Sequence, residues 1–286
     1  MRFGSRAAVM AVVVLTPLSN VGAQNAGKNL AMDFRMTNSV SGMPDTGVIV
    51  GHAIGTADKM RLDLSMKGIS AKVTPIADST VSMIVTDSGK TITYLDVRKS
   101  QFLRVRPAEM VAQAQQMGGM KMDFSETTAK VDSLGAGPAI LGHPTSHYRV
   151  TTGMTMSISA MGQQQTVKIA SSNDAYYATD LKGYLNPFTT LTGGDMSAIF
   201  GKSNKDFGDK MKAVQQKLPK GTPLRALSTA TVVAQGQTRV TNSAAEVTGI
   251  QWVAADPKTF EVPSSYTATQ LPGMGGSSPG TVPPPE

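Results

Sequence analysis

The chain has 286 residues, a formal net charge of +7, no cysteine, 18 methionines and only 5% aromatic residues. Without cysteine it has no disulfide framework and no thiol nucleophile, and we expect no lipoprotein anchor, because that anchor needs a cysteine to carry the lipid. The basic residues are scattered and do not alternate with aromatic residues. This pattern excludes the usual nucleic-acid surface, which combines clustered charge with stacking groups.

The N-terminus has the pattern of an export signal peptide. Arg2 and Arg6 make a basic start, residues 7–15 form an apolar run, and residues 21–23 (Val-Gly-Ala) are small enough for cleavage. The run is too short for a bilayer span, which takes about 20 apolar residues. We therefore expect a signal peptide over residues 1–23 and a mature protein in the periplasm or outside the cell, with both compartments left open.

From residue 28 onward, short segments alternate apolar and polar residues. The clearest are 30–37, 60–67 and 154–159. This period of two predicts antiparallel strands with one covered face, and the short polar breaks between them predict a meander. Residues 135–138 (Gly-Ala-Gly-Pro) predict a further turn, and residues 260–266 a last extended segment with Pro263 at a sheet edge.

Two segments show helical spacing. The first follows Pro107 and ends at 118–119 (Gly-Gly), and the second runs over about 195–218, with Gly208 as a place for a kink. The pattern predicts an α+β, mostly β fold: a curved antiparallel sheet, an incomplete barrel, lidded by two amphipathic helices. We expect one domain over residues 28–268 and a disordered Gly/Ser/Pro-rich tail over 271–286.

Two short motifs carry a resemblance to a known group of proteins. They are the step Gly142-His143 followed by Tyr148-Arg149-Val150, and the element Phe260-Glu261-Val262-Pro263-Ser264-Ser265-Tyr266. On these the chain resembles secreted bacterial proteins of unknown function that look like distant members of the LolA/LolB-like periplasmic lipoprotein-carrier superfamily. The resemblance spans residues 28–268 and implies an incomplete antiparallel barrel whose concave side is lidded by helices. It implies no particular lipoprotein-binding residue, because no specific motif for one is present.

Methionine is the most unusual feature of the composition, and many methionines fall on the apolar faces of predicted strands. A flexible, polarizable thioether suits an adaptable apolar surface. The sequence therefore predicts a non-enzymatic binding protein that holds a hydrophobic ligand, lipid or lipidated partner on the concave face of the sheet. The residues expected to line that face are Met32, Phe34, Met36, Met60, Leu62, Leu64, Met66, Met122, Met154, Met156 and Ile158. The alternative is ordinary core filling, and then the protein is a structural or interaction module of the cell envelope.

Metal and enzyme chemistry find little support in the sequence. His143, His147, Met154 and Met156 are close together, and thioether plus imidazole suits Cu(I), but these methionines alternate as core residues do. We predict no metal and no cofactor, and expect both histidines to make local hydrogen bonds. The patterns Gly-x-Ser-x-Gly, Gly-x-Gly-x-x-Gly and the P-loop are absent. We therefore predict no catalytic residue; a cluster of buried charged groups would revive the enzyme alternative.

Overall fold

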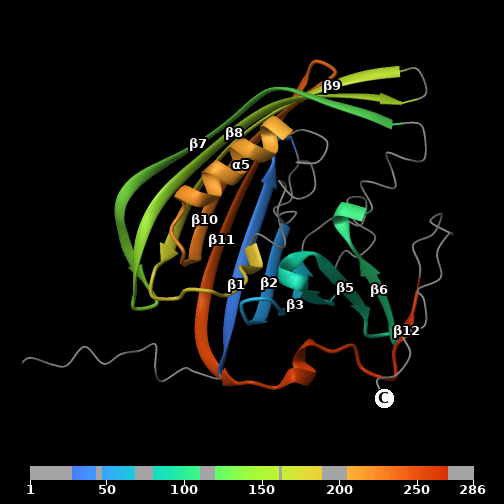
Figure 1. Cartoon of the computed structure of the whole chain (residues 1–286), viewed down its shortest axis with the longest axis vertical. Helices are drawn as coiled ribbons and strands as arrows, with labels where there is room; N and C mark the ends of the chain where they lie inside the picture. The colour runs from blue at the N-terminus through green and yellow to red at the C-terminus, as the bar shows by residue number, and fades with distance from the viewer. Residues whose placement is uncertain are drawn as a thin grey trace, which may run out of the picture.

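The structure of the chain is a computed structural model, which describes residues 28–42, 47–67, 80–109, 120–160, 163–188 and 205–269. The predicted signal peptide (1–23), the predicted tail (271–286) and most of the first predicted helix lie outside these residues. All the described strands belong to one sheet (Figure 1). The strands are β1 (Lys28–Val40), β2 (Gly47–Gly55), β3 (Met60–Lys67), β4 (Thr80–Thr86), β5 (Thr91–Asp96), β6 (Gln101–Val105), β7 (Met120–Ile140), β8 (His143–Ala160), β9 (Gln163–Ala178), β10 (Thr222–Ala234), β11 (Gln237–Ala254) and β12 (Thr267–Ala268).

The sheet is built from two meanders joined at one seam. Its order is β12-β6-β5-β4-β3-β2-β1-β11-β10-β9-β8-β7, so β1 to β6 run side by side, β7 to β11 do the same, and β1 pairs with β11. All pairings are antiparallel except that of β12 with β6. The prediction of a mostly β protein with a large antiparallel sheet is confirmed.

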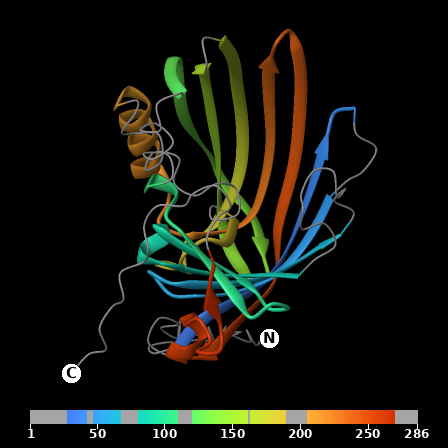
Figure 2. The same ribbon diagram turned by 90° about the vertical axis from the view of Figure 1, so that its right-hand side faces the viewer.

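The sheet is strongly bent, so its two faces have different surroundings. The strands of the first meander cross in front of the lower part of the second (Figure 2). We call the face that carries Met36 and its register partner Ala245 the inner face, and the opposite face the outer face. Because side chains alternate along a strand, the pairing register shows on which of the two faces each of the other strand residues lies.

The hydrophobic core lies on the inner face around the seam. Leu30, Met32 and Phe34 of β1 are completely buried and pack with residues of β3 and β11. The ring of Phe34 meets that of Phe188 edge to face, with centroids 5.7 Å apart. Gly51 lies beneath this ring, and a Cβ there would sit 2.3 Å from Phe34 Cζ, so the core requires a glycine at this position.

The prediction of a turn at residues 135–138 is wrong. These residues lie within β7, where the pairing with β8 shifts register between Ser133 and Gly135 and again between Gly137 and Ile140. The turn comes later, at Leu141 and Gly142, whose φ values of 50° and 81° lie in the left-handed region. A β-bulge and a turn both use glycine at positive φ, so the same sequence signal serves either structure.

The end of the described chain differs from the extended segment predicted over 260–266. Pro257–Phe260 forms a 3₁₀ helix, η2, and its cap residue Asp256 accepts a hydrogen bond from the backbone N–H of Lys258. A turn at 264–265 follows, and only Thr267–Ala268 pairs with β6. The local cap and the missing N–H of Pro263 thus take precedence over strand pairing.

One α-helix longer than a single turn is present in the described ranges. It is α5 (Lys205–Lys217), which continues through Gly208 and packs mainly along β7 through buried Phe207 and Val214. Thr127 of β7 donates a hydrogen bond to Asp206, and Lys210 pairs with the same carboxylate at 2.7 Å. The two-helix lid stays a prediction. Within the same ranges, no helix has both the length and the apolar character needed to cross a bilayer.

Candidate functional site

The predicted ligand-facing residues fall into two groups, and the larger group is buried in the core. These residues are Met32, Phe34, Met36, Met60, Leu62 and Leu64, each at most 5% exposed. They pack against one another across β1, β2 and β3. This end of the inner face is therefore closed by its own side chains.

The second group lies farther from the core, where the inner face is partly exposed. Met154 and Met156 on β8 and Met66 on β3 are partly exposed, and Met122 and Ile158 are register partners whose side chains lie outside what the structure describes. We call the partly exposed apolar residues of this face on β8, β9 and β10 the methionine strip. It consists of Met154, Met156, Val167, Ile169 and Val232, which all lie beyond Thr152 and Ser171 as seen from the core.

The register makes the methionine strip continuous across three strands. Met154 lies opposite Ile169, and Ile169 lies opposite Val232. One pleat farther along, Met156 lies opposite Val167. Neighbouring side chains on one face of paired strands are about 4.5–5.5 Å apart. The strip is thus one apolar surface that side chains of β8, β9 and β10 form together.

A band of polar side chains separates the methionine strip from the core. We call it the polar band; it consists of Asn38, Thr152, Ser171, Asn173, Ser228 and Ser243, which follow one another in register. The hydroxyls of Thr152 and Ser171 lie 2.7 Å apart in a hydrogen bond. The side-chain oxygen of Asn173 is buried, and no residue in the described ranges gives it a hydrogen bond.

Two tyrosines mark the core side of the polar band. Tyr148 lies opposite Ala175, the next inner-face position after Asn173, and its ring meets Tyr177 edge to face with centroids 6.1 Å apart. Burial raises the pKa of Tyr177 to about 12, since an apolar surrounding disfavours the phenolate. The inner face on the core side of the polar band therefore has low polarity.

The outer face of the same strands carries the charged residues. Arg149 donates to both carboxylate oxygens of Asp174, at 2.9 and 3.0 Å, and His147 lies 3.1 Å from one of them while it stacks on Tyr176. The Arg149 guanidinium lowers the pKa of Asp174 below its usual value, and His147 contributes less. Arg225 and Glu246 form an ion pair one strand farther along.

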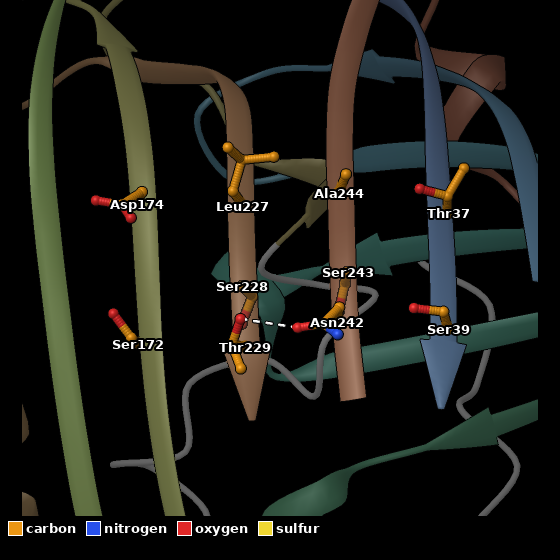
Figure 3. Close-up of a pocket in the computed structure, with 10 residues that line it drawn as sticks. All are labelled: Thr37, Ser39, Ser172, Asp174, Leu227, Ser228, Thr229, Asn242, Ser243 and Ala244. Atoms are coloured by element: carbon orange, nitrogen blue, oxygen red, sulfur yellow. Dashed lines mark hydrogen bonds between the residues drawn. The ribbon is translucent and has the colours of Figure 1, made fainter. Parts of the chain in front are cut away.

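A polar hollow of about 370 Å³ lies beside these charges on the outer face (Figure 3). Its lining includes Thr37, Asp174, Leu227, Thr229 and Asn242, and Thr229 donates a hydrogen bond of 2.9 Å to Asn242. A second hollow of about 450 Å³ lies between residues 138–141 and the Arg225–Glu246 pair. Neither hollow includes a residue of the methionine strip.

The histidines are held by aspartates that are distant in sequence. His147 pairs with Asp174 across two strands, and His143 lies 2.7 Å from Asp180, which is 37 residues away. The hydrogen bonds expected for both histidines thus exist, but their partners are distant in the sequence and come close only in the fold. Nowhere in the described part of the chain do three or more His, Cys, Asp or Glu side chains gather as a metal site would require.

Sequence reasoning missed several residues of this site. Val167 and Ile169 lie on either side of Lys168, so the alternation of apolar and polar residues could have predicted their shared apolar face. Asn173 had no such signal, because it sits among small polar residues where alternation does not show which face is covered. Only the pairing with Val150 and Ser228 places it on the inner face.

Comparison with known proteins adds no family. No family model matches the chain, and no curated protein matches it. A solved structure of PNGF-II, in a C2 crystal form, is similar at 12% identity and a TM-score of 0.32. The match covers 85% of this chain but only 31% of that one, so the chain spans about a third of the length of that protein. A likeness of this size carries no argument about fold or function.

Proposed function

We propose that this protein is an exported, non-enzymatic binding protein of the LolA/LolB-like kind, which holds a hydrophobic ligand, lipid or lipidated partner against the methionine strip. The observation that carries the proposal is the difference in exposure along one face. Met32 and Met60 are fully buried, whereas Met154 and Met156 remain partly exposed on the same side of the sheet. The second pair can therefore meet a ligand without unfolding the core.

The chemistry of the strip fits this role. Branched side chains from β9 and β10 provide a firm apolar surface, and two unbranched methionines can adjust to ligands of different shape. Contiguous exposed apolar patches on a protein often mark the site of a ligand or partner. The two surface hollows have mixed polar linings and suit small polar molecules, so they do not compete for an apolar ligand.

Native mass spectrometry of the protein from a periplasmic extract, prepared without detergent, tests the proposal. The wild type should carry an added mass that solvent extraction releases as lipid. The double variant Met154→Glu/Met156→Glu should lose it, because a ligand would have to bury two carboxylates. Thr151→Glu is the matched control, since Thr151 is exposed on the outer face of the same strand and should keep the added mass.

The opposite result would favour the alternative function, a cell-envelope interaction module. The observation behind that alternative is that six of the eleven predicted ligand-facing residues are at most 5% exposed. A wild-type protein that shows only its apo mass, even after incubation with phospholipids and acylated peptides, would contradict the carrier and favour the module.

A further inference from the structure

We infer that the ligand of the methionine strip is an uncharged amphiphile, and that its hydroxyl or N–H group donates a hydrogen bond to the side-chain oxygen of Asn173. This inference rests on the proposed function and names the class of ligand. Its starting point is the buried Asn173 oxygen, which has no hydrogen-bond partner among the residues that the structure describes.

A buried acceptor without a donor is costly. An unsatisfied buried acceptor loses its hydrogen bonds to water without replacement, and the great majority of buried polar atoms in folded proteins have a partner. The neighbouring hydroxyls of Thr152 and Ser171 are hydrogen-bonded to each other. A ligand that brings a donor to Asn173 removes this cost on binding, and a ligand without one does not.

The distribution of charge selects against an ionic ligand. Along β8, β9 and β10, every charged residue described between positions 146 and 178 or 225 and 234 lies on the outer face; these residues are Arg149, Lys168, Asp174 and Arg225. The inner face of the same strands offers only apolar, hydroxyl and amide side chains. A carboxylate or ammonium group buried beside Asn173 would find no counter-charge on these strands. Arg239 of β11 shares the inner face, but it lies opposite Val232, four residues along β10 from Ser228, the register partner of Asn173. A charged group at Asn173 would therefore keep most of its desolvation cost.

The geometry also orients the ligand. Asn173 lies next to the Tyr148–Tyr177 pair at the core side, and Val167 lies six residues farther along β9, a distance of about 20 Å in an extended strand. The polar group of the ligand therefore lies toward the core, and its apolar part runs along Ile169, Met154 and Met156.

Isothermal titration calorimetry with two matched probes tests this assignment. 1-Dodecanol carries a donor, and dodecyl methyl ether has the same chain without one. The wild type should bind the alcohol about three- to tenfold more tightly, the ratio that one net hydrogen bond provides. Asn173→Leu, which keeps the size of the side chain, should bind both probes equally. Dodecanoate should bind the wild type more weakly than the alcohol.

Asn242→Leu is the matched control, because Asn242 is an exposed amide on the outer face and its loss should leave the preference unchanged. If the wild type binds both probes equally, or if Asn173→Leu keeps the preference, the assignment of Asn173 is wrong while the carrier function stands. If neither probe binds, the carrier function fails with it. A tighter dodecanoate complex would overturn the uncharged ligand class.

Discussion

Asp174 is shared by two basic side chains on the outer face, Arg149 and His147. It accepts two hydrogen bonds from Arg149 and one from His147, and these contacts lower its pKa in the folded protein. In the unfolded chain the carboxyl returns to about 3.9. The stability it contributes is therefore present above that value and is lost as the pH falls through the lower folded value.

Asp174→Asn tests this linkage. At pH 7 the variant should be less stable than the wild type by up to about 1 kcal/mol, the range of exposed ion pairs. The difference should shrink as the pH falls below about 4, and urea unfolding between pH 2.5 and 7 measures it. A difference that stays constant over this range would mean that the carboxylate charge is not what Asp174 contributes.

At the residue scale, the sequence identifies side chains whose position follows from the alternation of apolar and polar residues. It does not identify side chains whose position follows from the pairing of distant strands. Met154 and Met156 were predicted to face the ligand because they alternate with threonine and serine. Asn173 gains its position only from strands that are distant in sequence. The role of Asp174 likewise depends on Arg149, which is 25 residues away.

The element with the clearest local strain is the β7–β8 hairpin. Its turn places Leu141 at a φ of 50° and Gly142 at 81°. A leucine is unusual there, because a side chain with φ above zero is tolerated mainly as asparagine or aspartate, and glycine has no such penalty. The side chain of Leu141 is also 48% exposed and contributes little to the core.

Leu141→Asn should therefore raise the free energy of unfolding by about 0.5–1 kcal/mol. Gly142→Ala should lower it by about 1–2 kcal/mol, since a Cβ meets no other atom there and the cost is conformational alone. Thermal unfolding followed by circular dichroism measures both. An unchanged melting temperature in both variants would show that this turn does not limit stability.

At the element scale, periodicity predicts strands well and their ends poorly. The segments 30–37 and 60–67 were predicted close to the observed bounds of β1 and β3, whereas 154–159 is only the last third of the longer β8. Residues 135–138 were not predicted correctly, because a glycine-rich segment does not reveal whether the chain turns or bulges. The helical spacing of residues 205–217 was correct, and Gly208 did not end the helix because the buried Phe207 and Val214 hold it against β7.

The arrangement of the whole molecule depends on one pairing, that of β1 with β11. It joins residues at the two ends of the described chain, from Lys28 opposite Ala254 to Val40 opposite Thr241. No local signal predicts such a contact. This seam nevertheless decides the function we propose, because it closes the inner face near Met32 and Met36 and leaves the distant part of β8 and β9 partly exposed.

Methyl NMR of the methionines tests most directly whether the ligand binds at the partly exposed methionines and not at the buried ones. With 13C-methyl methionine in the wild type, titration with 1-dodecanol should shift the signals of Met154 and Met156 and leave those of Met32 and Met60 in place, with single Met→Leu variants for assignment. Unchanged signals for Met154 and Met156 at saturating probe, or shifts confined to Met32 and Met60, would contradict a ligand site on the methionine strip.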